Sequence, residues 1–147
     1  MSKILSYKGL IENNGIDKIL LSTNKGERGY RIKKFQLIGS DLTGVTQESC
    51  VKIMLTNPGT ADGVVDFSDQ RLLAVGFYEQ NTSSSYFGDQ VVIFDHKVFN
   101  QDIFISHIEG TATPPDHNVN YYVELEETKL SEHDAMVATI QNIRNLQ

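Results

Sequence analysis

The feature that most constrains this sequence is a series of short apolar runs with alternating polarity, separated by turn-forming residues. In the clearest run, residues 119–126, Val119, Tyr121, Val123 and Leu125 occupy every second position. Period-two alternation predicts a strand with one buried face. About eight such runs with no helical pattern between them predict an all-β, antiparallel β-sandwich, with the jelly roll as one candidate strand order.

Several further elements follow from turn chemistry and periodicity. The Asn14-Gly15 pair tolerates positive φ, so residues 4–11 and 16–22 are predicted to form a hairpin. The apolar phase slips near Lys33 and Lys34, which predicts a β-bulge within a strand over residues 29–39. Other strands are predicted at residues 50–56, 64–67, 71–79, 90–95 and 101–107.

The period changes at the C-terminus. Ser131 is a suitable helix N-cap, and Met136, Val137, Ile140 and Ile143 then follow helical spacing. These residues predict one short α-helix at about residues 131–145. With 147 residues and no evident linker, residues 1–147 are expected to form a single domain.

Charge and cysteine content argue against several classes of protein. The chain has 13 basic and 19 acidic residues and a net charge of -6, which disfavours nucleic acid as a partner. No apolar stretch reaches the roughly 18 residues of a membrane span. The single cysteine, Cys50, excludes an intrachain disulfide, and no segment has the pattern of a signal peptide. We therefore expect synthesis in a reducing cytoplasm.

The chemistry-bearing residues do not form a recognisable catalytic set. The sequence contains no nucleotide-binding glycine loop, no hydrolase nucleophile motif and no metal-binding helix motif. A cupin-like metal site would require His96, His107 and His117 to converge although they are widely spaced, and we expect His107 to be a structural histidine. Cys50 opens an apolar strand without a nearby base and is expected to act as a small buried hydrophobe. We expect no enzyme activity, metal or cofactor.

Two segments are candidates for contact with partners. Residues 81–89 read as a polar loop carrying Tyr86 and Phe87, which either form a recognition surface or fold back onto the core. The helix stripe that contains Met136, Ile140 and Ile143 either docks on a neighbouring protein or packs across its own sandwich.

The run VVIFDHKVFNQDIFISHIEG, followed by NYYVELEETKLSEHDAMVATIQNIRN, resembles small virion structural proteins of tailed bacteriophages. The likeness covers most of the chain and brings no catalytic residues with it. It implies a capsid decoration or cement protein that stabilises the assembled head. The implied partner is the major capsid protein or another virion protein. The chain would be made in the host cytoplasm, incorporated into the virion and act as a homo-oligomer, with a trimer favoured.

A carbohydrate-binding sandwich module of a phage tail or receptor-binding structure is the alternative function. Such modules bind sugars through exposed aromatic side chains. The chain has no Trp, but the tyrosines could serve, among them Tyr78, Tyr86, Tyr121 and Tyr122.

Overall fold

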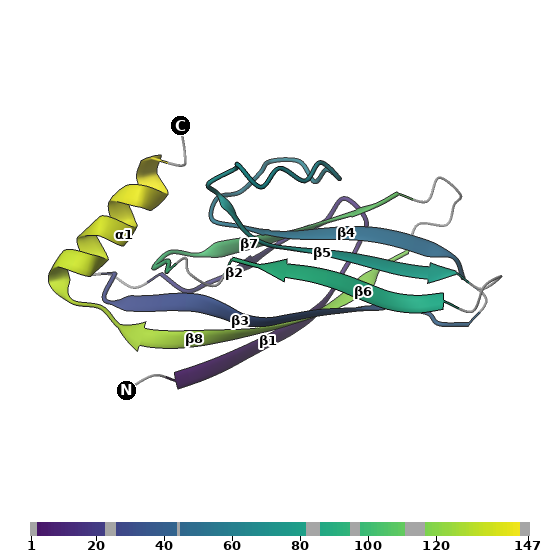
Figure 1. Cartoon of the computed structure of the whole chain (residues 1–147), viewed down its shortest axis with the longest axis horizontal. Helices are drawn as coiled ribbons and strands as arrows, with labels where there is room; N and C mark the ends of the chain where they lie inside the picture. Colours follow the sequence, from purple (N-terminus) through teal and green to yellow (C-terminus); the bar gives the residue numbers. More distant parts are fainter. Residues whose placement is uncertain are drawn as a thin grey trace.

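The computed structural model describes residues 3–22, 26–43, 45–81, 86–94, 98–110 and 117–144, and within these ranges the chain is a two-layered β-sandwich with one terminal helix (Figure 1). In chain order the elements are β1 (Lys3–Ile11), β2 (Ile16–Ile19), β3 (Arg28–Gly39), β4 (Gln47–Met54), β5 (Leu72–Asn81), β6 (Tyr86–Ile93), β7 (Ile103–Glu109), β8 (Val119–Lys129) and α1 (Glu132–Arg144). The predicted all-β sandwich with a C-terminal helix is confirmed.

The strands form a three-stranded sheet, β1-β8-β3, and a five-stranded sheet, β2-β7-β4-β5-β6. All ladders are antiparallel. The first strand pairs with the last, β2 pairs with β7, and β4 pairs with β5, which is the nested pairing of a jelly roll. The sixth strand departs from that pattern because it pairs with β5 rather than β3. It nevertheless reaches β3 through Asp89, whose carboxylate accepts a hydrogen bond from the Leu37 amide at 3.0 Å.

The core lies between the two sheets and follows from the alternation in the sequence. The odd-numbered residues of β8, from Val119 to Leu125, are buried, while Tyr122 and Glu124 on the opposite face are only partly so. Their counterparts in the five-stranded sheet are fully buried aliphatic side chains, including Val51, Ile53, Ile103 and Ile105. Burial of these facing rows accounts for the pairing of the two layers.

The predicted hairpin between residues 4–11 and 16–22 is wrong. β1 belongs to the three-stranded sheet and β2 to the five-stranded sheet, so the connection crosses between layers. The reversal itself is present: Asn14 has a φ of 66°, and the Gly15 amide donates to the Glu12 carbonyl at 2.9 Å. The Asn14 amide donates to the His107 carbonyl in β7, which holds the turn against the second layer.

Two other predictions of local structure, one of a strand and one of a loop, need correction. Residues 64–67 form no strand and belong to the long β4–β5 connection. The segment 81–89 is not a loop throughout, since β5 continues to Asn81 and β6 begins at Tyr86. Two predictions of local structure are confirmed: the β3–β8 register shifts between Ile32 and Lys34, and α1 begins after Ser131, whose hydroxyl accepts a hydrogen bond from the Asp134 amide at 3.2 Å. No helix among the described residues combines the length and apolar character needed to cross a membrane.

Candidate functional site

The C-terminal helix α1 lies at one end of the sandwich and is held there by small and polar residues (Figure 1). Asn100 is buried, and its side-chain amide donates to the Gly26 carbonyl and the Ala135 carbonyl at 3.1 Å each and to the Thr139 hydroxyl at 2.8 Å. The Asn142 amide reaches the Leu55 carbonyl at 3.4 Å. Among the described side chains, directional hydrogen bonds therefore fix the face of α1 toward the sandwich.

Three large apolar residues of the helix are exposed to solvent, whereas the small Ala135 is buried. Met136 is 60% exposed, Val137 40% and Ile140 49%. The fourth residue of the predicted stripe, Ile143, has a side chain outside the described set. An amphipathic helix normally buries its apolar face against its own domain. Packing of this stripe across the sandwich is thus not observed for the three described residues, and α1 presents an apolar surface outward.

The other predicted contact residues lie elsewhere. Phe87 is in β6, paired with Gln80, and is 46% exposed. The Tyr86 side chain lies outside the described set, although its backbone pairs with Asn81. β6 begins at the end of the sandwich opposite α1 (Figure 1). The structure therefore does not bring the Tyr86–Phe87 pair and the helix stripe together into one surface.

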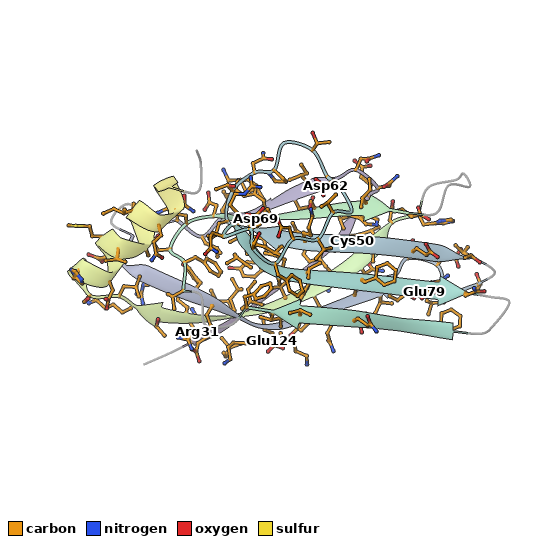
Figure 2. All side chains as sticks on the ribbon, turned by 45° about the horizontal axis from the view of Figure 1, so that its top comes forward. Arg31, Cys50, Asp62, Asp69, Glu79 and Glu124 are labelled. Atoms are coloured by element: carbon orange, nitrogen blue, oxygen red, sulfur yellow. The ribbon has the colours of Figure 1, made fainter. Side chains whose placement is uncertain are left out.

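A further apolar surface covers part of the outer face of the five-stranded sheet. The connection between β4 and β5, residues 55–71, folds over this face and is pinned by Lys52. The Lys52 ammonium donates to the Asp62 carboxylate at 2.6 Å and to the Val64 carbonyl at 2.9 Å. The hydrogen bond from Lys52 lowers the pKa of the Asp62 carboxyl, and the Val64 amide contributes in the same direction. Figure 2 shows Asp62 above the strand that carries Cys50.

Three apolar residues of this connection remain exposed: Val64 at 70%, Val65 at 45% and Phe67 at 59%. Phe67 also packs edge-on against Phe94, with ring centroids 5.2 Å apart. The sequence does not predict this surface because its two adjacent valines favour a strand. The turn signals on either side, Asn57-Pro58-Gly59 and Asp62-Gly63, were the available evidence for a loop.

The outer face of the three-stranded sheet carries a groove of about 470 Å³. Its floor is Asn120, which sits between Leu10 and Ile38 in the ladder register. The next row along the sheet places Tyr122 between Lys8 and Gln36. Leu10 and Ile38 are exposed by 54% and 58%.

Tyr122 is fixed at one end of the groove. Its hydroxyl donates to the Glu124 carboxylate at 2.6 Å, and this hydrogen bond raises the pKa of the phenol. The Lys34 ammonium lies 6.0 Å from the centre of the ring. Glu124 and Arg31 are labelled on this side of the sandwich in Figure 2, on the opposite side from Asp62.

The histidines do not form a shared site among the described residues. His107 is fully buried, and its two ring nitrogens contact the Ile11 carbonyl at 3.2 Å and the Ser49 hydroxyl at 2.9 Å. His117 pairs through Nδ1 with the Glu109 carboxylate at 2.8 Å. His96 lies outside the described residues. The prediction that His107 is a structural histidine is confirmed by its hydrogen bonds.

Cys50 and the acidic side chains were the remaining candidates for a nucleophile or a metal site. Burial raises the pKa of the Cys50 thiol, although Lys52 opposes the shift, so the thiol is favoured over the nucleophilic thiolate. In the described part of the chain, no cluster of three or more His, Cys, Asp or Glu side chains is arranged to hold a metal ion.

Comparison with known proteins gives little further information. No family model and no curated protein matches the chain. Among solved structures, the chain is similar to the cryo-EM structure of a VLP of the extra small virus of the giant freshwater prawn Macrobrachium rosenbergii. That match has 10% sequence identity and a TM-score of 0.31, and it covers 84% of this chain and 79% of the other. A likeness at this level carries no conclusion about function.

Proposed function

We propose that this protein is a structural component of a phage virion, a decoration or cement protein that binds the capsid surface without catalytic activity. The observation that carries the proposal is the outward apolar stripe of α1, in which Met136, Val137 and Ile140 are exposed while the helix is anchored by Asn100. A rigidly held apolar helix face is suited to helix-in-groove or helix-on-surface docking.

Two further observations support the proposal. The sequence resembles small virion structural proteins of tailed bacteriophages, and the jelly-roll type of sandwich is used by viral capsid domains among others. The fold alone is compatible with several functions, so the exposed surfaces carry more weight. Contacts with the shell would be repeated many times by its symmetry, which turns small individual interfaces into firm attachment.

The experiment is co-sedimentation of the purified chain with assembled phage shells that lack it. The wild-type chain is expected to sediment with the shells and to raise their resistance to heat. The double substitution Met136→Glu and Ile140→Glu is expected to abolish binding because it buries charge at the interface. Gln141→Glu, on an exposed polar position of the same helix, is the matched control and should bind normally. Failure of the wild-type chain to bind or protect shells would refute the proposal.

A carbohydrate-binding function is the second candidate, and the groove around Asn120 favours it. Amide side chains of Asn120 and Gln36, the ring of Tyr122 and the aliphatic Leu10 together offer hydrogen bonds and apolar contact, which suits a sugar ring. A glycan array tests it directly. Binding that is lost in Tyr122→Ala but retained in Phe87→Ala, an exposed aromatic outside the groove, would place this function ahead of the capsid proposal.

A further inference from the structure

β1 forms an outer edge of the three-stranded sheet. It pairs with β8 along one side over all nine of its residues. Along the other side, no strand of the described chain pairs with it, and in Figure 1 it lies at the border of the molecule. An open strand edge carries backbone donors and acceptors that can pair with another strand.

The hydrogen bonds of β3 establish which groups of β1 face outward. The Tyr30 backbone exchanges two hydrogen bonds with Phe99, at 2.7 and 2.9 Å, on the side of β3 away from β8. The Leu37 amide likewise points away from β8, toward Asp89. In an antiparallel ladder, opposed residues direct their polar groups either both inward or both outward. The β8 residues opposite Tyr30 and Leu37 therefore point toward β1.

Those β8 residues are Glu127 and Tyr121, and their partners in β1 are Lys3 and Gly9. The odd-numbered residues of β1 consequently bond to β8. Backbone direction alternates along a strand, so the even-numbered residues direct their N–H and C=O groups to the open edge. They are Ile4, Ser6, Lys8 and Leu10.

The side chains of the same four residues lie on the outer face of the sheet, and their order is self-complementary. Ile4 is 55% exposed and Leu10 is 54% exposed, and they are placed symmetrically about Tyr7. Ser6 and Lys8 are the next symmetric pair. A strand with this arrangement matches its own copy when that copy is rotated by a twofold axis through Tyr7.

We propose that β1 is a homodimer interface, in which two copies of the chain pair their β1 strands antiparallel about a twofold axis at Tyr7. Ile4 lies opposite Leu10 of the partner subunit, and Ser6 lies opposite Lys8 of the partner subunit. Every outward N–H and C=O of the four even-numbered residues is then used. The two three-stranded sheets join into one continuous sheet.

Neighbouring registers fit less well. A twofold axis at Lys8 would place the two Lys8 ammonium groups directly opposite each other, which is repulsive. An axis at Ser6 would pair Ile4 with Lys8 and leave Leu10 without an apolar partner. The Tyr7 register alone among these combines full backbone pairing with apolar contact.

The other sheet edges are less available. The side of β3 that faces away from β8 already forms hydrogen bonds with the Phe99 backbone and the Asp89 carboxylate. β2 has only four residues. β6 turns the carboxylate of Asp89 inward, a device that discourages pairing along an edge strand. β1 is therefore the edge most suited to a second copy. The proposal does not depend on the virion function, and pairing through β1 leaves α1 at the end of the sandwich free to bind another protein.

The test is the molar mass of the purified full chain, measured by sedimentation over a wide concentration range. A dimer, or an even-numbered oligomer, is expected. Leu10→Lys should raise the dissociation constant of the pair about tenfold because the altered contact occurs twice. Ile38→Lys is the matched control, since Ile38 is equally exposed on the same face but lies in β3, and it should leave the mass unchanged.

A register-specific rescue sharpens the test. Combining Ile4→Glu with Leu10→Lys places opposite charges across the pair and should restore the dimer that either single substitution weakens. Ser6→Pro removes an outward N–H without touching the β8 ladder and should abolish pairing while the fold persists. A wild-type monomer at every concentration, a trimer insensitive to these substitutions, or failure of the double variant to restore the dimer would each overturn the proposal.

Discussion

Replacing Asn100 by alanine is expected to loosen α1 from the sandwich. This one side chain links Gly26, which precedes β3, to Ala135 and Thr139 in the helix. The substitution removes an NH2 group whose two hydrogens are shared among three acceptors, on Gly26, Ala135 and Thr139. A buried neutral hydrogen bond contributes about 0.5–1.5 kcal/mol net. The Ala135 carbonyl keeps a bond from the Thr139 hydroxyl at 2.9 Å, so the largest penalty falls on the Gly26 carbonyl.

These contributions predict a loss of about 2–3 kcal/mol in the free energy of unfolding for Asn100→Ala. Urea denaturation followed by far-UV circular dichroism measures the global change. Native-state amide exchange measures local release of α1, which should increase more than exchange in β4 or β8. Asn120→Ala is the control because its amide makes one long bond, 3.3 Å to the Gly39 carbonyl.

The reasoning would be refuted if Asn100→Ala changed the unfolding free energy by less than about 0.5 kcal/mol and left exchange in α1 unaltered. That result would mean that the helix is held by contacts other than this hydrogen-bonded node. It would also weaken the argument that the outward direction of the Met136 stripe is fixed by polar anchoring.

Two other perturbations have defined outcomes. Gly76→Ala should destabilise the fold by about 1–3 kcal/mol in thermal or urea unfolding, because a Cβ there would lie 2.7 Å from the Leu37 side chain, whereas Gly63→Ala, with its nearest atom at 3.5 Å, should be close to neutral. Burial lowers the pKa of His107 in the folded state, so the unfolded chain binds more protons below its ordinary pKa of about 6.5. Stability should therefore fall as pH drops below about 6.5. His107→Gln should flatten this dependence, as unfolding curves between pH 5 and 8 would show.

The sequence predicted elements where local pattern and tertiary environment agree. Residues 119–126 alternate strictly, and β8 became the central strand of its sheet with its odd-numbered residues buried. The bulge near Lys33 was predictable because a phase slip in a strand has few other solutions. The N-cap at Ser131 was predictable because the hydroxyl acts on an amide only three residues away.

Strand pairing is not predictable from local pattern where the two paired strands are far apart in the sequence. Residues 4–11 and 16–22 carry a valid turn, yet their partners, β8 and β7, lie at the other end of the sequence. Val64 and Val65 have strand propensity, but the hydrogen bonds of Lys52 to Asp62 and to the Val64 carbonyl hold their segment over the outer face of the sheet. β-propensity measures how well a side chain suits a pleated, half-buried surface. It therefore does not distinguish a paired strand from a segment of the same composition that pairs with no strand.

The candidate contact surfaces also combine features that local sequence predicts with features that depend on remote contacts. The apolar stripe of Met136 and Ile140 was evident from spacing, but its outward direction depended on Asn100, which is remote in sequence from the helix. The groove at Asn120 and the open edge of β1 both depend on how β1 and β3 are aligned with β8. This register is a property of paired strands and is not encoded in the sequence of any one of them.

Local sequence pattern is enough to predict that the chain forms half-buried strands, that one of them bulges and that the terminal helix begins after Ser131. These properties depend on side-chain periodicity and on contacts within a few residues. Three features follow only from the packed fold: which strands pair, which helix residues face solvent and which strand edge is unpaired within the described chain. The physical reason is that these features arise from contacts between residues tens of positions apart, whose free energies become available only when both sheets have packed.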